Sequence, residues 1–116
     1  MREVTFYRTA SGNCPIEQFL DSLTERQSAK IIWTLELVEE LEIVPKQYFK
    51  KLVDTDDIWE IKVKIGRDNF RILSFFDGPN LVVLNHAFSK QTRKIPKSEI
   101  RLAEERKRDY FRRKIQ

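Results

Sequence analysis

The alternation of apolar and polar residues along residues 58–65 is the clearest secondary-structure signal in the chain. A period of two places successive side chains on opposite faces of a strand. Glu60, Lys62 and Lys64 therefore point one way, and the apolar residues between them and on either side, Trp59, Ile61, Val63 and Ile65, point the other way. The pattern predicts a half-buried β-strand with one charged face.

Two further strands are predicted at residues 70–76 and 81–88, because a turn-forming segment precedes each of them. Residues 66–69 and 77–80 contain the Gly, Asn, Asp and Pro that tight turns favour. The three strands are therefore expected to be antiparallel neighbours in one sheet. Residues 81–84 are apolar at every position, which predicts an interior strand covered on both faces.

The register expected from these turns brings cationic side chains together on one face. Lys64 is expected opposite Arg71, and Arg71 opposite His86, with Lys62 one step along the first strand. Directly opposed side chains share a face, with Cβ atoms about 5 Å apart, and like charges in such pairs are destabilising. Because such a row of cations destabilises the sheet, its presence points to a function. The row is therefore a candidate site for an anion such as phosphate.

Helical periodicity surrounds the three strands on both sides in the sequence. Pro15 suits a first helical position, and Thr24 with Gln27 forms the sequence pattern of a capping box. The predicted helices span residues 15–23, 24–42 and 97–113, and a first strand spans residues 2–8. The expected fold is α+β in the order β-α-α-β-β-β-α. It has a four-stranded, mostly antiparallel sheet with the two N-terminal helices on one face and a C-terminal helix.

Length, cysteine use and charge narrow the class of protein. The 116 residues suit one domain, no apolar run is long enough to span a membrane, and a single cysteine favours a reducing cytoplasm. Residues 90–116 hold eleven Lys/Arg and four Asp/Glu, a net +7, while residues 1–89 carry −3. Such asymmetry indicates a polyanionic partner, with a solvated basic helix as the equally weighted alternative.

The cationic face continues into a basic loop at residues 89–94, and the combined set suits phosphodiester binding. It also suits metal-free RNA cleavage, in which the 2′-OH attacks the neighbouring phosphate and cations stabilise the developing charge. His86 is expected to be neutral among cations and to act as a base; a lysine with a lowered pKa is the alternative. A third reading is that His86 is only a strand residue satisfied by its neighbours. The carboxylates at residues 54–57 lack the spacing of a calcium loop, so no metal or other cofactor is expected.

Four motifs occur in a specific order, and they span residues 58–63, 70–73, 84–90 and 96–100. In these motifs the chain resembles the phage-derived HigB-like branch of the RelE/ParE toxin superfamily over nearly its whole length. The resemblance implies a RelE-like fold and a type II toxin that cleaves mRNA in the ribosomal A site without a metal. It also implies a cognate helix-turn-helix, HigA-like antitoxin, with operator DNA bound through the toxin–antitoxin complex.

The resemblance also assigns roles to individual residues. It matches Lys62, Lys64, Arg71, His86, Lys90 and Arg93 to site positions of the family. The predicted catalytic residues are Arg71, Lys90, His86 and Lys64, and the predicted RNA-binding residues are Lys62, Arg93, Lys94 and Lys97. The sequence departs from the branch at Gln91, where a second lysine is usual, which weakens the catalytic assignment there. Two alternatives stay open, a non-enzymatic ParE-like gyrase poison and an inactive member that binds only its antitoxin and operator DNA.

Overall fold

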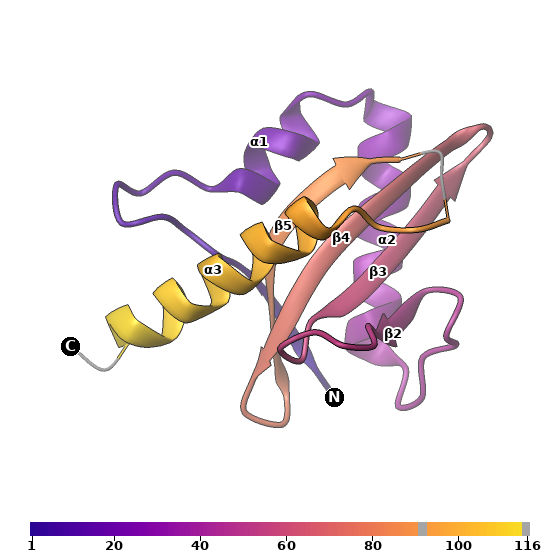
Figure 1. Ribbon diagram of the computed structural model, residues 1–116. Helices are drawn as coiled ribbons and strands as arrows, with labels where there is room; N and C mark the ends of the chain where they lie inside the picture. Colours follow the sequence, from indigo (N-terminus) through magenta and orange to yellow (C-terminus); the bar gives the residue numbers. More distant parts are fainter. Residues whose placement is uncertain (91–92, 115–116) are drawn as a thin grey trace.

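A single sheet with helices on both faces organises the computed structural model, which describes residues 1–90 and 93–114 (Figure 1). Position 91, where the sequence departs from the HigB-like pattern, lies outside the described residues. The elements are β1 (Glu3–Phe6), α1 (Pro15–Asp21), α2 (Glu25–Glu40), β2 (Phe49–Lys51), β3 (Trp59–Ile65), β4 (Asp68–Asp77), β5 (Leu81–Ser89) and α3 (Lys97–Lys114).

The strand order is β1-β5-β4-β3-β2, with β1 parallel to β5 and the other neighbours antiparallel. The α+β class and the order of the predicted elements are confirmed. The expected number of strands is corrected from four to five, because the short segment Phe49–Lys51 pairs with β3. This strand has three residues and two adjacent lysines, so it shows no alternation that the sequence could reveal.

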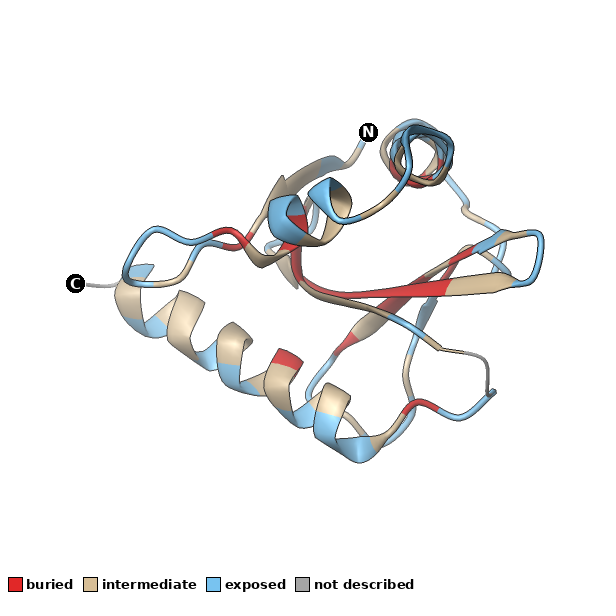
Figure 2. Ribbon diagram, turned by 90° about the horizontal axis from the view of Figure 1, so that it is seen from above, coloured by how far each residue is buried: buried red, intermediate tan, exposed pale blue. Residues whose placement is uncertain are grey.

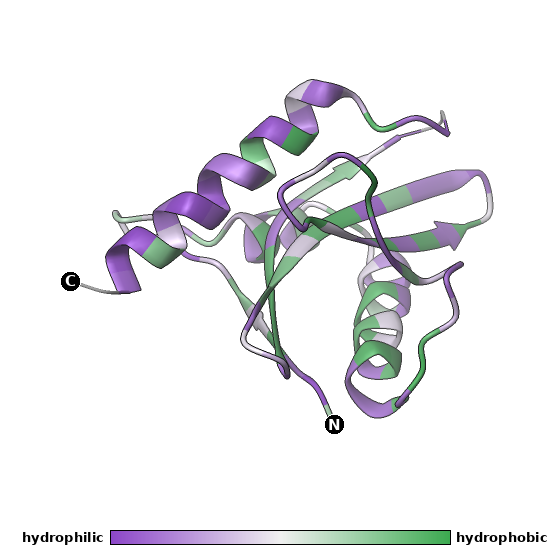
Figure 3. Ribbon diagram, turned by 60° about the horizontal axis from the view of Figure 1, so that its bottom comes forward, coloured by the Kyte–Doolittle hydropathy of each residue, from purple (hydrophilic) through white to green (hydrophobic). Residues whose placement is uncertain are grey.

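Two separate layers of helix cover the sheet (Figure 2). Helices α1 and α2 cover one face, where Ile31, Ile61 and Leu84 belong to the largest buried cluster. Helix α3 lies on the other face and is predominantly hydrophilic (Figure 3). Helix α3 packs less extensively on the sheet, because Ala103 is its one buried side chain among the described residues. Interior strand β5 is therefore covered on both sides, as predicted.

The predicted starts of α1 and α2 are confirmed, and each depends on a local sequence signal. Pro15 occupies the first turn of α1. The capping box of α2 is present, because the Gln27 amide donates to the Thr24 hydroxyl at 3.2 Å and Gln27 Oε1 accepts from the Thr24 amide at 3.0 Å. This exchange satisfies two backbone N–H donors at a helix start that would otherwise lack partners.

The predicted register of the three central strands is wrong, although the predicted charged face is right. The turn between β3 and β4 has only two residues, so Lys62 pairs with Arg71 and Lys64 pairs with Asn69. A bulge between Leu73 and Ser74 then shifts β5, so that His86 pairs with Leu73 rather than with Arg71. The expected single row of Lys64, Arg71 and His86 is thus spread over three rows of the α3 side of the sheet.

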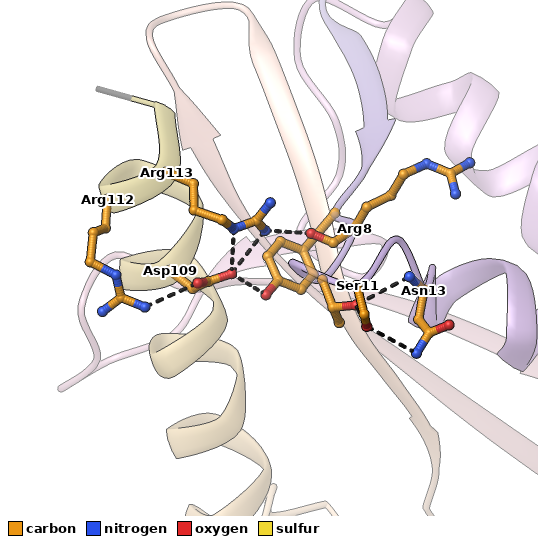
Figure 4. A network of polar contacts seen from close by, with 8 residues as sticks. Arg8, Ser11, Asn13, Asp109, Arg112 and Arg113 are labelled. Carbon is orange, nitrogen blue, oxygen red and sulfur yellow. Dashed lines mark hydrogen bonds and ion pairs between the residues drawn. The ribbon is translucent and has the colours of Figure 1, made fainter. Parts of the chain in front are cut away.

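The C-terminal half of α3 is fastened to the sheet by polar contacts (Figure 4). The Tyr7 hydroxyl donates to Asp109 at 2.5 Å, and Arg113 lies 2.8 Å from the same carboxylate. The hydrogen bond from Arg113, with that from Tyr7, lowers the pKa of Asp109 to about 2. Further along, the Tyr110 hydroxyl donates to Asp77 at 2.7 Å. Among the described residues, no helix is long and apolar enough to cross a membrane.

Candidate nucleic-acid interface

A cleft of about 490 Å³ opens between the segment after β2 and the first turns of α3. Three predicted RNA-binding residues, Arg93, Lys94 and Lys97, line it together with Lys50 and Arg101. They come from three parts of the chain, namely β2, the segment before α3, and α3 itself. The lining also holds three carboxylates, from Asp54, Glu60 and Glu104, so the concave site keeps an excess of positive charge, which suits a phosphodiester ligand.

Arg71 lies beneath this surface and not on it. Its guanidinium forms an ion pair with the carboxylate of Glu60 on the neighbouring strand, and the two side chains are 6% and 2% exposed. Lys50 Nζ lies 3.9 Å from the other carboxylate oxygen of Glu60. Within the described part of the chain, the buried Arg71 Nε has no hydrogen-bond partner. The arginine predicted to bind phosphate is therefore neutralised by a carboxylate, which itself lines the cleft.

His86 links strand β5 to α3. Its Nδ1 lies 3.4 Å from a guanidinium nitrogen of Arg106, and its Nε2 lies 3.3 Å from the carboxylate of Glu99. Burial is the main cause of a lowered His86 pKa; Arg106 adds to the effect and Glu99 opposes it. The imidazole is therefore neutral at neutral pH, as expected, but burial rather than a row of cations is the leading cause.

The hydrogen bonds beside His86 also join strand β5 to helix α3. The side-chain amide of Asn85 donates to the Ala103 carbonyl at 2.6 Å, and Arg106 donates to the Asn85 carbonyl at 2.8 Å. His86 thus lies in a polar group that holds α3 on the sheet. This geometry favours a structural role of His86 over its use as a base. Within the described part of the chain its buried Nε2 has no hydrogen-bond partner and lies only within ion-pair distance of Glu99.

The remaining predicted lysines lie along the same side of the sheet. Lys62 is half-buried beside Arg71, and Lys64 is exposed opposite Asn69. The Lys90 amide donates to the Asn69 carbonyl at 2.9 Å. Lys64 and Lys90 therefore flank Asn69 at one end of the sheet, whereas Arg93, Lys94 and Lys97 line the cleft.

Sequence reasoning missed the acidic partner in this site. Glu60 belongs to the polar side of an alternating strand, where a carboxylate is usually solvated, yet it is almost fully buried. A signal was present, because Glu60 is the only acid among the three polar positions facing this side of the strand. No group of three or more His, Cys, Asp or Glu side chains that could hold a metal ion is found in residues 1–90 and 93–114.

Comparison with known proteins gives one match that covers most of this architecture. Residues 18–108 match the family described as phage-derived protein Gp49-like (DUF891). The matched segment runs from α1 into α3 and includes all eight predicted site residues. A comparison with curated proteins gave no match. The chain therefore belongs to the phage-derived Gp49-like family, which is part of the RelE-like group of type II toxin–antitoxin proteins.

Proposed function

We propose that this protein is a type II toxin that cleaves mRNA on the ribosome, with the cleft beside the start of α3 as its active site. The observation that carries the proposal is the gathering of cations, including Arg93 and Lys97, around a cleft lined by Glu60. Clustered Lys and Arg suit the RNA backbone, and family membership supports a toxin. We assign the chain to the HigB-like branch of this group on the four sequence motifs at residues 58–63, 70–73, 84–90 and 96–100.

The proposed reaction is attack of an RNA 2′-OH on the adjacent phosphate, which leaves a 2′,3′-cyclic phosphate and a free 5′-OH. It requires a proton acceptor for the 2′-OH and a proton donor for the leaving 5′ oxygen. Glu60 lines the cleft and pairs with Arg71 beneath its surface, and we assign the Glu60 carboxylate the acceptor role. An incoming phosphate competes with Glu60 for Arg71, which frees the carboxylate and places the guanidinium on the developing charge.

Lysines on the same side of the sheet complete the proposed site. Lys62 lies directly beside Arg71, so we assign it a share in proton donation to the leaving oxygen. Lys64 and Lys90 lie further along the face and are assigned to the RNA backbone. His86 is assigned to holding α3, because Arg106 and Glu99 already face its two ring nitrogens.

The proposed partners follow from the toxin assignment. A toxin of this group implies an antitoxin, and we propose a helix-turn-helix protein of the HigA-like type that binds operator DNA with the toxin. The ribosome would present the mRNA codon in its A site. We therefore propose that the protein acts in the cytoplasm, where operator DNA and translating ribosomes are found.

A second candidate is a non-enzymatic toxin that binds and poisons a target such as gyrase. One observation favours it, namely the neutralisation and burial of Arg71 by Glu60. An arginine held in this way stabilises a phosphate only after the pair separates. In a purely binding toxin the pair would stay closed, and the exposed cations would serve partner recognition alone.

Controlled expression of the wild type and of Arg93→Ala/Lys97→Ala, with mapping of mRNA 5′ ends, distinguishes the two candidates. Both replaced residues line the cleft, and both are exposed. The matched control is Arg26→Ala/Lys46→Ala, which removes the same charge from exposed positions elsewhere. We expect growth arrest and cuts within translated codons for the wild type and the control, and loss of both for the cleft variant. Arrest without cuts in the wild type would contradict the ribonuclease and favour the binding toxin.

A further inference from the structure

The walls of the cleft contain more than a backbone-binding site needs. Leu52 and Ile100 are apolar and pack against a buried cluster that includes Ile95. Glu104, from α3, adds a carboxylate to a lining that also holds Asp54 and the ion-paired Glu60. Phosphate groups require only donors and cations, so the apolar wall and the acid point to another part of the ligand.

The size and the division of the cleft fit one nucleotide. A volume of about 490 Å³ lies within the range of small-molecule sites, roughly 300–1,000 Å³. Its cations Arg93 and Lys97 suit the phosphates, while Leu52 and Ile100 offer an apolar surface to a flat base. Proteins read single-stranded RNA by stacking splayed bases on flat side chains, including arginine guanidinium groups, and by bonding to their Watson–Crick edges. In this cleft Arg93 and Arg101 supply guanidinium groups, and the apolar surface is aliphatic.

Glu104 is positioned before any ligand arrives. Its Oε2 accepts a hydrogen bond from the Asp56 backbone amide at 2.9 Å, which ties the carboxylate to the loop on the opposite wall. An ionised carboxylate accepts about four hydrogen bonds and donates none, so acceptor capacity remains after this contact. A group fixed in advance discriminates better, because less side-chain ordering opposes binding.

We propose that the cleft binds a guanosine of the RNA, with the base read by Glu104; this inference rests on the proposed function. Guanine presents two adjacent donors, N1–H and the N2 amine, which match the two oxygens of one carboxylate. Adenine, cytosine and uracil each place an acceptor beside their donor on the same edge, and that acceptor would face the carboxylate unfavourably. The cleft thereby adds base selection to backbone binding.

Binding of non-cleavable RNA to the full chain tests the proposal. The probes are 2′-O-methyl trinucleotides with a central guanosine, inosine, adenosine or uridine between two uridines, followed by amide chemical shifts. Inosine differs from guanosine only by loss of the 2-amino group. We expect guanosine to bind about tenfold more tightly than inosine, in line with the discrimination of bidentate contacts. The shifts should centre on residues 50–54 and 97–104.

Two matched variants separate base reading from a structural role of Glu104. Glu104→Gln should abolish the difference between guanosine and inosine, whereas Glu105→Gln, at the exposed neighbouring position, should keep it. Equal binding of guanosine and inosine by the wild type would overturn the proposal, as would the same shifts from inorganic phosphate alone. Equal weakening of all four probes by Glu104→Gln would reduce the residue to a support for the loop at Asp56 and would also overturn it.

The outcome is distinguishable from failure of the proposed function. Guanosine discrimination without mRNA cleavage would leave the base site standing and remove the ribonuclease. Cleavage of mRNA in cells, without any preference among the trinucleotides in binding, would support the ribonuclease and remove the guanosine site.

Discussion

Arg71 of β4 and Glu60 of β3 form an ion pair that is almost completely shielded from water, with side chains 6% and 2% exposed. The pair lies on the side of the sheet that faces α3, and Glu60 also lines the cleft at the start of that helix. Burying two charges costs solvation free energy, which their mutual attraction roughly offsets. A buried pair is therefore weak evidence for stability, and its place beside a cationic cleft gives it a functional interpretation.

Replacing Arg71 alone should destabilise the fold strongly. Arg71→Met leaves the Glu60 carboxylate buried without its partner, which typically costs about 3–5 kcal/mol of unfolding free energy. The double variant Glu60→Met/Arg71→Met removes both charges and should recover most of that loss. Denaturant unfolding of the two single variants and the double variant gives the coupling energy directly.

A cost below about 1 kcal/mol for Arg71→Met would show that the pair is solvated and would contradict its burial. The stability of Arg71 variants also decides how their toxicity can be interpreted. Loss of growth arrest in an Arg71 variant is ambiguous if the protein unfolds, so replacements of exposed cleft cations are the better functional test.

The single histidine offers a direct measure of how α3 is held. We expect His86 to titrate below its ordinary pKa of 6.5, because burial outweighs the attraction of Glu99. Nuclear magnetic resonance reads this titration without ambiguity, since the chain has one imidazole. Glu99→Gln should lower the pKa of His86 further, because it removes the group that raises it. A midpoint above 6.5 in the wild type would mean that Glu99 dominates.

This lowered pKa also predicts how stability depends on pH. The unfolded chain binds a proton at His86 near pH 6.5, before the folded chain does, so its contribution to stability is present above that pH. The contribution is lost as the pH falls through the lower folded pKa. His86→Gln should therefore flatten the decrease in unfolding free energy between about pH 7 and the folded midpoint. An unchanged slope would indicate that other groups cause the decrease.

The Tyr7–Asp109–Arg113 contacts predict an acid-sensitive attachment of α3. The pKa of Asp109 is lowered to about 2, so its stabilising contribution is present above about pH 3.8 and disappears as the pH falls towards 2. Asp109→Asn should cost about 1 kcal/mol at neutral pH, a figure discounted for partial solvent screening. Unfolding at pH 7 and near pH 2 should show the wild type and the variant converging. A constant difference would place the effect in packing, not charge.

The parts of the fold that the sequence predicted are those set by local chemistry. The alternation of β3, Pro15 at the start of α1 and the Thr24–Gln27 capping box each depend on a few neighbouring residues. Their physical causes operate within one turn or one strand. The order of the elements and the charged side of the sheet followed from these local signals.

The register and the site composition depended on distant contacts. The two-residue turn at Gly66 and Arg67, together with the bulge after Leu73, moved His86 and Lys64 away from Arg71. At Arg71 both registers differ from the expected ones by two residues, which leaves every side chain on its predicted face, so the alternation along each strand gives no signal of the shift. The burial of Glu60 likewise could not be predicted without knowing where Arg71 and α3 lie relative to it.

The most direct test of the account is to incubate the purified chain with ribosomes programmed with a defined mRNA and to identify the RNA ends. We expect cuts at the A-site codon with a 2′,3′-cyclic phosphate on one side and a 5′-OH on the other. The Arg93→Ala/Lys97→Ala variant should lose them, and Arg26→Ala/Lys46→Ala should retain them. Intact mRNA with the folded wild-type chain, or equal cutting by both variants, would contradict an active site in the cleft.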